Sequence, residues 1–360
     1  MLTAASRDGH RVAIRGSGTK AAAPVDGLVL STLRLNAIVA HRHGDLTATV
    51  QAGATLADVN RALAVHRQWI PLDPPFADRA TIGGIVATND SGPRRHRYGA
   101  PRDLIIGAEF VRADGVAAKA GGIVVKNVAG YDVARLLTGS RGSLAVIVAA
   151  TFKLYPLPPT SRTAIVDVAG FKTCAAFLEM LLASQLTPTA IELQLPPGRL
   201  LVRFETIETA AEQQAAAVTR LAVDAGARAS IVRGQDDEQA WREHGRRPWD
   251  GDGAVLKIAV LPADVVPTVE WLAGRGVDYD IVGRAGVGVL LARMGGDAAA
   301  QARIVQDLRT RIGAGRGSVV IVRASDDLLA LADPLGPLGA ALPLMQAIKR
   351  RFDPAGILPT

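Results

Sequence analysis

The chain has 360 residues, of which 49% are hydrophobic but only 4% aromatic, and its formal net charge is +7. That length accommodates two domains with their own cores, and burial carried by alanine and valine favours a mixed protein of helices and strands. The single cysteine, Cys174, excludes an internal disulfide, a four-cysteine zinc site and an iron–sulfur cluster. Because the positive charge is scattered and no nucleic-acid motif accompanies it, we expect a solvated basic surface and no nucleic-acid partner.

The amino-terminal stretch MLTAASRDGHRV lacks the apolar core of a signal peptide, and no apolar run is long enough to span a bilayer. We therefore expect a cytoplasmic protein with no transmembrane segment. Any association with the inner membrane is expected to be peripheral, through a complex.

Residues 1–157 alternate short apolar runs with glycine-rich turns. Thr55 and Asp58 form a capping box that predicts the start of a helix. A second helix is predicted at YDVARLLTG, and PLPPT at 156–160 ends the domain. Strands are predicted at VAIR, GLVLST, LTATVQAG, LIIGAEFVRADG, which enters a hairpin, and SLAVIVAATFKLY.

Residues 158–325 repeat one order of elements twice: strand, helix, two strands, helix, strand. This order is typical of a ferredoxin-like split βαβ unit. We expect the two halves to pair into one large antiparallel sheet with helices on one face. Residues 326–360 are expected to return to the first domain through a short helix that ends at Asp353 and Pro354.

The stretch from Gly16 to Ala21, GSGTKA, has the form of a dinucleotide-binding fingerprint. A Rossmann turn requires a helix directly after its glycines and an acidic residue about 20 positions on. Here Pro24 and Gly27 follow, and a new strand begins at Leu28. A Walker A loop fails as well, because Gly-Thr-Lys has the wrong order. By itself the motif indicates either a strand-to-strand turn or another phosphate cradle.

Further motifs follow in a specific order. The segments 81–84 (TIGG) and 88–92 (TNDSG) place glycines and hydroxyls on both sides of an apolar stretch. Such a segment lets backbone N–H groups approach a ligand closely and offers side-chain donors to phosphate. KNVAGYD at 126–132 and LTGSRGSL at 137–144 come next, and the order and spacing together are more specific than any one motif.

With RGSGT, DPP, TIGGIVATNDSG, KNVAGYD and the tail FDPAGIL, the chain resembles the vanillyl-alcohol oxidase superfamily of PCMH-type FAD-binding proteins. Within it, SGPRR and VVKNVAGYD are most similar to the FAD-binding subunits of glycolate oxidase. The resemblance implies an α+β fold in three parts. These are a PCMH-type domain of two α+β subdomains at 1–157, a ferredoxin-like antiparallel-sheet cap domain at 158–325, and a carboxyl-terminal segment at 326–360 that returns to the FAD domain.

The same resemblance implies that RGSGT is a pyrophosphate loop, which needs no helix after it. It also implies noncovalent FAD, because no histidine stands where some relatives attach the flavin. The residues that would bind FAD are Arg15, Gly16, Ser17, Gly18, Thr19, Pro74, Thr81, Ile82, Gly83, Gly84, Thr88, Asn89, Ser91, Gly92, Gly142 and Ile147.

Some residues depart from the family pattern or have two interpretations. Relatives that oxidise D-2-hydroxy acids carry a histidine-rich metal site, whereas only His244 lies beyond residue 100 here, so no metal site is expected. Arg141 stands where many relatives have Glu, which leaves the adenine or ribose contact in doubt. His96 contacts an anionic substrate or, more ordinarily, belongs to a solvated basic cluster. Tyr131 approaches the flavin or packs, while Trp241 and Trp249 anchor a loop or an interface.

Three functions remain open from the sequence, and none of them assigns a catalytic base. The first is the flavin subunit of a glycolate-type dehydrogenase complex. In it, hydride passes from a small anionic 2-hydroxy acid to flavin N5, and electrons pass on to an iron–sulfur subunit beside a sister flavin subunit. The second is a self-sufficient flavin oxidase or dehydrogenase. The third is a noncatalytic subunit that only keeps the flavin fold.

Overall fold

The computed structural model describes residues 1–20, 27–123, 130–313 and 315–359. The chain divides into two compact units. The first comprises residues 1–94, 98–157 and 340–360, and the second comprises residues 95–97 and 158–339. The prediction that the chain leaves the second unit at residue 326 is wrong. Leu328 is fully buried in the core of that unit, which keeps residues 326–339 with it.

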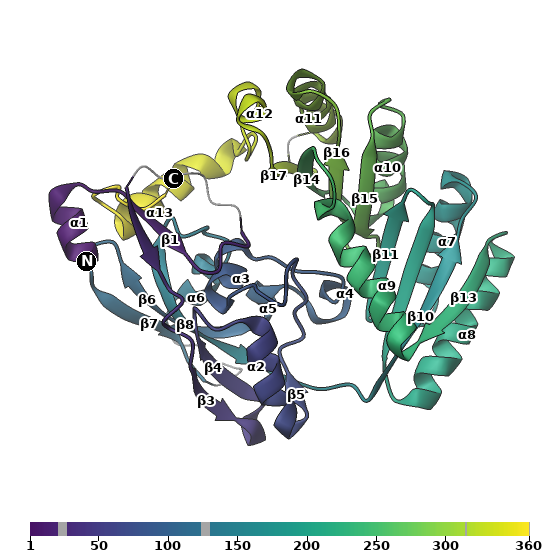
Figure 1. Ribbon diagram of the computed structural model, residues 1–360, viewed down its shortest axis with the longest axis horizontal. Helices are drawn as coiled ribbons and strands as arrows, with labels where there is room; N and C mark the ends of the chain where they lie inside the picture. Colours follow the sequence, from purple (N-terminus) through teal and green to yellow (C-terminus); the bar gives the residue numbers. More distant parts are fainter. Residues whose placement is uncertain (21–26, 124–129, 314, 360) are drawn as a thin grey trace. The chain divides into compact units, whose positions relative to one another are not determined.

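The first unit is built on a five-stranded antiparallel sheet of order β3-β4-β8-β6-β7 (Figure 1). Its strands are β3 (Ile38–Arg42), β4 (Thr47–Gln51), β6 (Ile105–Arg112), β7 (Ala117–Gly121) and β8 (Ala145–Lys153). Two smaller sheets join β1 (Val12–Arg15) to β2 (Leu28–Ser31) in parallel and β5 (Gln68–Trp69) to β9 (Tyr155–Pro156) antiparallel.

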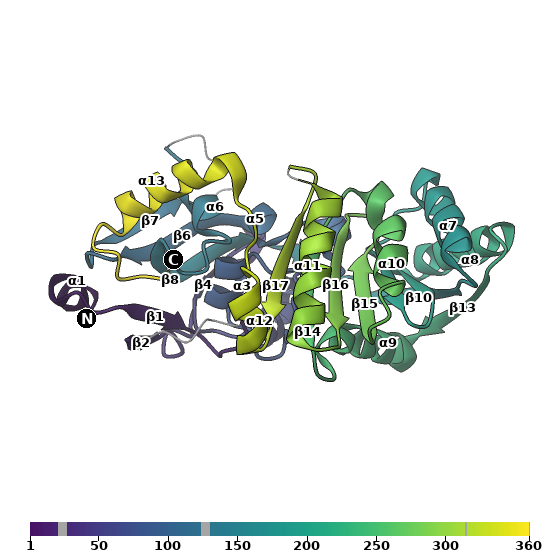
Figure 2. The same cartoon turned by 90° about the horizontal axis from the view of Figure 1, so that it is seen from above.

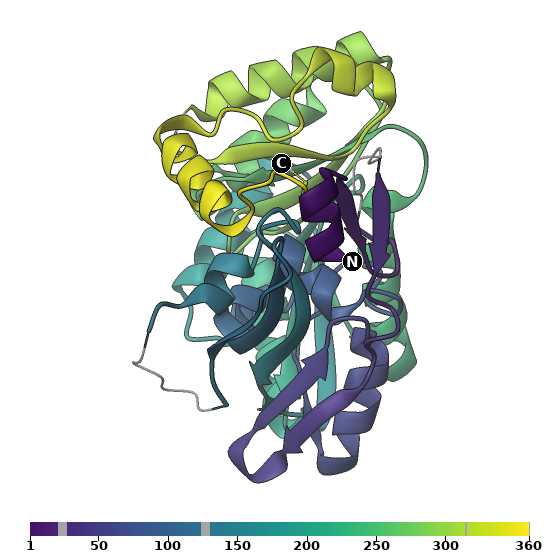
Figure 3. The ribbon, with the colours of Figure 1, turned by 90° about the vertical axis from the view of Figure 1, so that its left-hand side faces the viewer.

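Short helices surround this sheet. They are α1 (Leu2–Asp8), α2 (Leu56–Leu63), α3 (Ile82–Thr88), α4 (Arg95–Tyr98, of which only Tyr98 belongs to this unit), α5 (Pro101–Leu104), α6 (Val133–Leu137) and α13 (Leu342–Phe352). The predicted capping box is confirmed, because Thr55 Oγ1 accepts a hydrogen bond from the Asp58 backbone at the start of α2. Both ends of the chain meet in one small core, where Leu2, Val12 and Leu358 are buried together (Figure 3).

The second unit contains one antiparallel eight-stranded sheet of order β13-β10-β12-β11-β15-β16-β14-β17, as predicted (Figure 2). The two halves have mirrored strand orders and join where β11 pairs with β15. The strands are β10 (Thr160–Asp167), β11 (Ala190–Leu195), β12 (Arg199–Thr206), β13 (Arg228–Arg233), β14 (Ala254–Ala259), β15 (Tyr279–Arg284), β16 (Val289–Met294) and β17 (Ser318–Arg323).

The two faces of this sheet are covered differently. One face packs its apolar side chains under α7 (Phe171–Ala183), α8 (Glu208–Asp224), α10 (Val265–Ala273), α11 (Ala298–Ile312) and α12 (Asp326–Leu331). The expectation that all helices share that face is wrong, because α9 (Gly234–Arg246) packs on the other face (Figure 1). On that face, polar side chains of α9 bond polar side chains of the strands, whereas the opposite face of the sheet is apolar. None of the helices in the described ranges is long and apolar enough to cross a membrane.

Candidate functional site

The predicted pyrophosphate loop is a tight turn at the end of β1, and it lies against the start of α3. A Cβ atom on Gly16 would come within 2.3 Å of Thr81 Oγ1, so only glycine allows this approach. Gly18 has a φ of +77°, and a Cβ there would meet nothing within 4 Å. The hydroxyls of Ser17 and Thr19 lie 3.5 Å apart on the same turn. The loop therefore presents hydroxyls and bare backbone to open space, an arrangement that suits a phosphate group.

The first residues of α3 have separate roles. The N–H groups of Ile82 and Gly83 donate to the carbonyls of Ala54 and Ala52, at 2.9 and 2.7 Å. The Ile82 side chain is fully buried, and a Cβ on Gly83 would lie 2.8 Å from that of Ala52. Gly84 borders the loop, because its added Cβ would lie 3.2 Å from Thr81 Oγ1. The structure thus brings Thr81 and Gly84 to the loop and uses Ile82 and Gly83 for packing.

Lys20 was not among the residues predicted from the sequence. Its side chain passes over Gly84, and its Nζ lies 2.5 Å from Asp90 Oδ2 and 3.1 Å from the Pro75 carbonyl. The side chains of Lys20 and Asp90 are only 13% and 20% exposed. A lysine directly after a glycine-and-hydroxyl loop was the available signal, because it adds a fixed positive charge where an anion would bind.

Arg141 and Gly142 are joined to the same region. The Arg141 N–H donates to the Ala87 carbonyl at 2.7 Å, and a Cβ on Gly142, whose φ is +79°, would press on Ile14 of β1 at 3.2 Å. Burial lowers the pKa of Arg141, and the negative charge of Asp90 opposes that shift. Asp90 therefore lies near two cations. Ile147, predicted on the adenosine side, has its side chain in the apolar core.

The remaining predicted residues lie in three places: Arg15 ends β1, Thr88 ends α3 and is followed by the loop with Asn89, Ser91 and Gly92, and Pro74 lies beside that loop. Asn89 follows α3 with a φ of +48°, and its Oδ1 accepts a hydrogen bond from the Arg102 backbone. Thr88 Oγ1 donates to the Gly84 carbonyl, and Ser91 is buried. Gly92 lies directly on Asp73, next to Pro74, where a Cβ would overlap the Asp73 carbonyl. Close contacts and a hydrogen bond thus join segments from distant parts of the sequence at the end of α3.

Of the KNVAGYD motif, residues 126–129 lie outside the described residues, and residues 130–132 are described. Tyr131 is 93% exposed, so its interpretation as a packing tyrosine is wrong. Asp132 caps α6 by accepting a hydrogen bond from the Arg135 backbone.

The residues around the loop fit the diphosphate of a dinucleotide. The set contains hydroxyls, glycines that permit close approach, and the two cations Lys20 and Arg141. Asp90 pairs with Lys20 and lies near Arg141, so these three side chains together leave a positive charge beside the hydroxyls and glycines, which suits an anionic group. The described residues contain no group of three or more His, Cys, Asp or Glu side chains that could hold a metal ion.

In the second unit, a chain of polar contacts ties α9 to the sheet. Trp241 Nε1 donates to Thr163 Oγ1, which also bonds Asp237, and Arg203 Nη2 donates to Asp237 Oδ2 at 3.0 Å. The interpretation of Trp241 as a loop or interface anchor is therefore wrong. Farther along, His244 lies 2.8 Å from Glu192 and 2.9 Å from Gln194. The sequence offered a signal here, since Glu and Gln alternate with apolar residues in the strand AIELQL.

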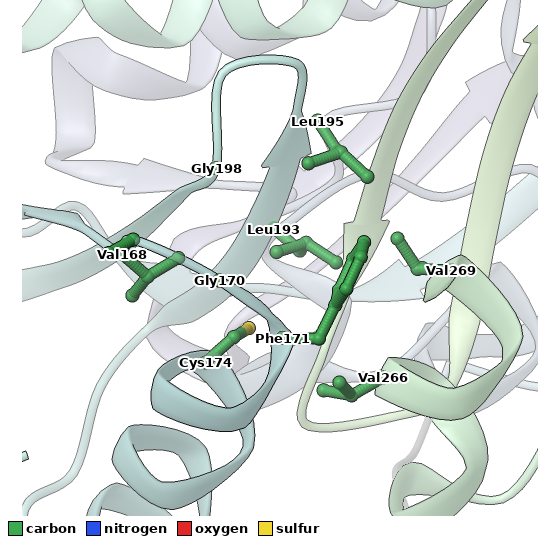
Figure 4. A pocket seen from close by; sticks show the side chains of 10 residues that line it. Val168, Gly170, Phe171, Cys174, Leu193, Leu195, Gly198, Val266 and Val269 are labelled. Atoms are coloured by element: carbon green, nitrogen blue, oxygen red, sulfur yellow. The ribbon is translucent and has the colours of Figure 1, made fainter. Parts of the chain in front are cut away.

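An apolar cavity of about 180 Å³ also lies in the second unit, between α7, α10 and β11. Its lining is Val168, Ala169, Gly170, Phe171, Cys174, Leu193, Leu195, Gly198, Val266 and Val269 (Figure 4). Burial raises the pKa of Cys174 to about 12, so its thiol stays protonated at neutral pH. With no charged group in its wall, this cavity offers no acid–base chemistry.

Residues 1–121 match a family described as "FAD binding domain". Glycolate oxidase subunit GlcD of Bacillus subtilis is 37% identical over 54% of this chain and 42% of its own length. Glycolate oxidase subunit GlcE of Escherichia coli is 38% identical over 41% of this chain and 43% of its own length. The chain thus spans less than half of each of these relatives.

Two longer matches cover nearly the whole chain. An uncharacterized FAD-linked oxidoreductase of Mycobacterium tuberculosis is 28% identical over 99% of this chain and 86% of its own length. A solved structure of alkyldihydroxyacetonephosphate synthase has a TM-score of 0.70 at 17% identity, covering 99% of this chain and 73% of the other. The latter similarity supports the predicted fold class and nothing about activity.

The turn at Gly16, its partner Thr81 and the family match together define the class: this chain carries a PCMH-type FAD-binding domain. The predicted cofactor, FAD, is therefore confirmed. Within that class, the sequence is similar to subunits of glycolate oxidase, which agrees with the resemblance noted from its motifs.

Proposed function

We propose that the chain is an FAD-dependent oxidoreductase that oxidises a small anionic 2-hydroxy acid, of the glycolate type, at its CH–OH group. The observation that carries this proposal is the convergence of the Gly16–Thr19 turn, Thr81 and Lys20 in an FAD-binding domain. Relatives named as glycolate oxidase subunits, D-lactate dehydrogenases and D-2-hydroxyglutarate dehydrogenases support the substrate class.

FAD is held noncovalently in this proposal. Residues 16–19 bind its pyrophosphate, while Lys20 and Arg141 balance the negative charge. The flavin and its phosphates are lined by Arg15, Pro74, Thr81, Gly84, Thr88, Asn89, Ser91 and Gly92. The adenosine is faced by Gly142 and the backbone at Ile147. Ile82 and Gly83 support the binding site by packing beneath it. When bound, FAD supplies the two-electron oxidation by accepting hydride. The chain's own task is to orient the substrate and take its hydroxyl proton.

The chain acts as one flavin subunit of a complex that also contains a sister flavin subunit and an iron–sulfur subunit. Two relatives are named as subunits of glycolate oxidase, which supports a multi-subunit assembly. The single cysteine of the sequence is the buried Cys174, so electrons leave the flavin for a cluster on another chain or for a small acceptor. We place this complex in the cytoplasm, peripheral to the inner membrane.

The test is the visible absorption spectrum of the purified chain, followed by acid release and anaerobic addition of glycolate or D-lactate. We expect a yellow protein that releases about one FAD per chain and is bleached by one of these acids. Co-purification from the native source should recover a second flavin subunit and a cysteine-rich subunit. A colourless chain that cannot be reconstituted with FAD would contradict the proposal. A pure chain that reduces oxygen unaided would replace the complex by a self-sufficient oxidase.

A further inference from the structure

Three histidines cluster on the first unit, outside the residues assigned to FAD. His41 lies on β3, His43 begins the turn after that strand, and His66 ends the turn after α2. The centres of the His41 and His66 rings lie 5.2 Å apart, and those of His43 and His66 lie 4.5 Å apart. His43 and His66 are exposed, and His41 is half-buried. Because histidine is the commonest metal ligand among side chains, this cluster is a candidate site for an ion.

Gln68 fixes the ring of His41. It lies on β5 and is only 8% exposed. Its amide nitrogen donates to the His43 carbonyl at 2.8 Å, which fixes the orientation of the amide. Its amide oxygen lies 2.9 Å from Nε2 of His41 and therefore accepts the proton of that nitrogen, so Nδ1 keeps its lone pair. Metal-ligating histidines are held in this way, through the ring nitrogen that does not bind the ion.

The ring positions suit two ligands and not three. Two imidazoles on one tetrahedral ion keep their centres about 5 Å apart, because each Zn–N bond is about 2 Å long. His41 and His66 meet this condition, and their ring planes are 81° apart. The rings of His43 and His66 are parallel within 3°, so their nitrogens cannot both point at one ion. In agreement, no three His, Cys, Asp or Glu side chains of the described ranges could hold an ion together.

The structural alternative is that the three rings only pack on one another. Exposed rings in contact bury little apolar surface, so such packing would add little to stability. Packing also requires no particular ring nitrogen to stay open, whereas the hydrogen bonds of Gln68 leave one open on His41. An oriented nitrogen beside an exposed imidazole therefore favours an ion as the shared partner of His41 and His66.

We propose that His41 and His66 bind one divalent transition-metal ion of the Zn²⁺ or Cu²⁺ type, with water completing its coordination. One ligand is Nδ1 of His41, and the other is a ring nitrogen of His66, whose exposed side chain can turn toward the ion. Gln68 is a positioning residue, and His43 only stacks on His66. This site departs from the expectation, drawn from the sequence, that the chain holds no metal. It does not rest on the function proposed above, because none of these residues is assigned to FAD or to the substrate.

The experiment titrates Zn²⁺ into the full FAD-loaded chain, prepared without a polyhistidine tag, and follows binding by calorimetry. We expect about one ion per chain. His41→Asn and His66→Asn should each weaken binding at least about tenfold, because each removes one of only two protein ligands. His43→Asn is the matched control, since it removes an exposed histidine of the same cluster and should leave the affinity unchanged. His10→Asn, at an exposed histidine outside the cluster, controls for nonspecific binding.

Two variants of Gln68 test its positioning role. Gln68→Ala should weaken Zn²⁺ binding about tenfold, because His41 loses the partner that orients its ring. Gln68→Glu keeps an oxygen that can accept the His41 proton and should restore most of the affinity, which a merely structural role would not predict. Should both variants fail to fold, the comparison of the exposed positions His66 and His43 decides alone.

Copper gives a second readout on the same chain. Electron paramagnetic resonance of bound Cu²⁺ should show coupling to two imidazole nitrogens in the wild type and to fewer in His66→Asn. A wild-type chain that binds no Zn²⁺, or equal losses in His43→Asn and His66→Asn, would overturn the proposal. Coupling of Cu²⁺ to three imidazole nitrogens would overturn the assignment of two ligands.

Discussion

The two units hold their polar chemistry in opposite ways. In the first unit, the site is made mainly of backbone. Because Gly16 and Gly84 have no side chains, segments that are far apart in the sequence can approach one another there. In the second unit, buried carboxylates lie on regular strands and helices and bond buried polar partners: Glu192 bonds His244, and Asp237 bonds Arg203. The difference predicts how each unit breaks. Adding one carbon should disable the first unit, whereas removing one charge should disable the second.

The largest effect is expected from Asp237→Ala in the second unit. Asp237 is 1% exposed and accepts hydrogen bonds from Thr163 and Arg203. Removing it leaves the Arg203 guanidinium buried beside Trp241 without its closest anion, and breaking such a buried pair costs about 3–5 kcal/mol. Denaturant unfolding measures the loss. Asp236→Asn, the exposed neighbour on α9, is the control and should lie within about 0.5 kcal/mol of the wild type. If Asp237→Ala and Asp236→Asn were equally stable, the buried carboxylate of Asp237 would not stabilise the second unit, and the expected contrast with the first unit would be wrong.

The next effect is expected from Gly16→Ala in the first unit. The added Cβ would stand 2.3 Å from Thr81 Oγ1, and relieving such a contact costs about 1–3 kcal/mol. We expect FAD to bind about 5–150-fold more weakly, because the turn must move away from its cofactor-binding position. Fluorescence quenching during FAD titration of the stripped chain measures this. Gly44→Ala is the matched control, since a Cβ there meets nothing within 4 Å. Unchanged FAD affinity in Gly16→Ala would show that the turn does not hold the pyrophosphate.

A smaller effect is expected from Lys20→Met, which removes a charge from the first unit, where the site consists mainly of backbone groups. The variant should bind FAD and ADP about tenfold more weakly, the worth of one charge-assisted hydrogen bond, while riboflavin binding stays unchanged. The losses should shrink at high salt. Lys119→Met is the control, because Lys119 makes an exposed pair with Glu109. If riboflavin weakens as much as ADP, Lys20 shapes the loop and does not balance the phosphates.

The same contrast explains how much the sequence revealed. The first site could be predicted because its signals are local: glycines and hydroxyls mark their turns wherever the chain runs next. Lys20 has a local signal in its position directly after the loop, whereas its pairing with Asp90, 70 residues away, could not be predicted. The eight-stranded order followed from the repeated order of elements, since a split βαβ unit leaves few ways to pair its strands.

The polar face of the second unit could not be predicted in the same way. Glu192 and His244 come from separate segments, and only the packing of α9 on β11 brings them together. Helix α9 itself was missed, because its polar sequence, GQDDEQAWREHGR, is typical of a solvated segment. It stays helical because its buried side chains are polar groups with polar partners.

The smallest effect is expected from Glu212→Gln, which tests charge removal where the second unit faces solvent. Hydrogen bonds from Arg233 and then Arg162 lower the pKa of Glu212 from 4.5 to about 2. A carboxyl with a lowered folded-state pKa stabilises the fold above its unfolded pKa, and this contribution is lost as pH falls from about 4.5 to 2. The variant should therefore unfold slightly earlier than the wild type at pH 7, and the two unfolding temperatures should converge near pH 2. Glu179→Gln, an exposed site on α7, is the control. If the unfolding temperatures of the variant and the wild type differ by the same amount at pH 3 and pH 7, Glu212 acts by packing and not by its charge. The effect should be far smaller than that of Asp237→Ala, because solvent screens the charge of Glu212 on this exposed face.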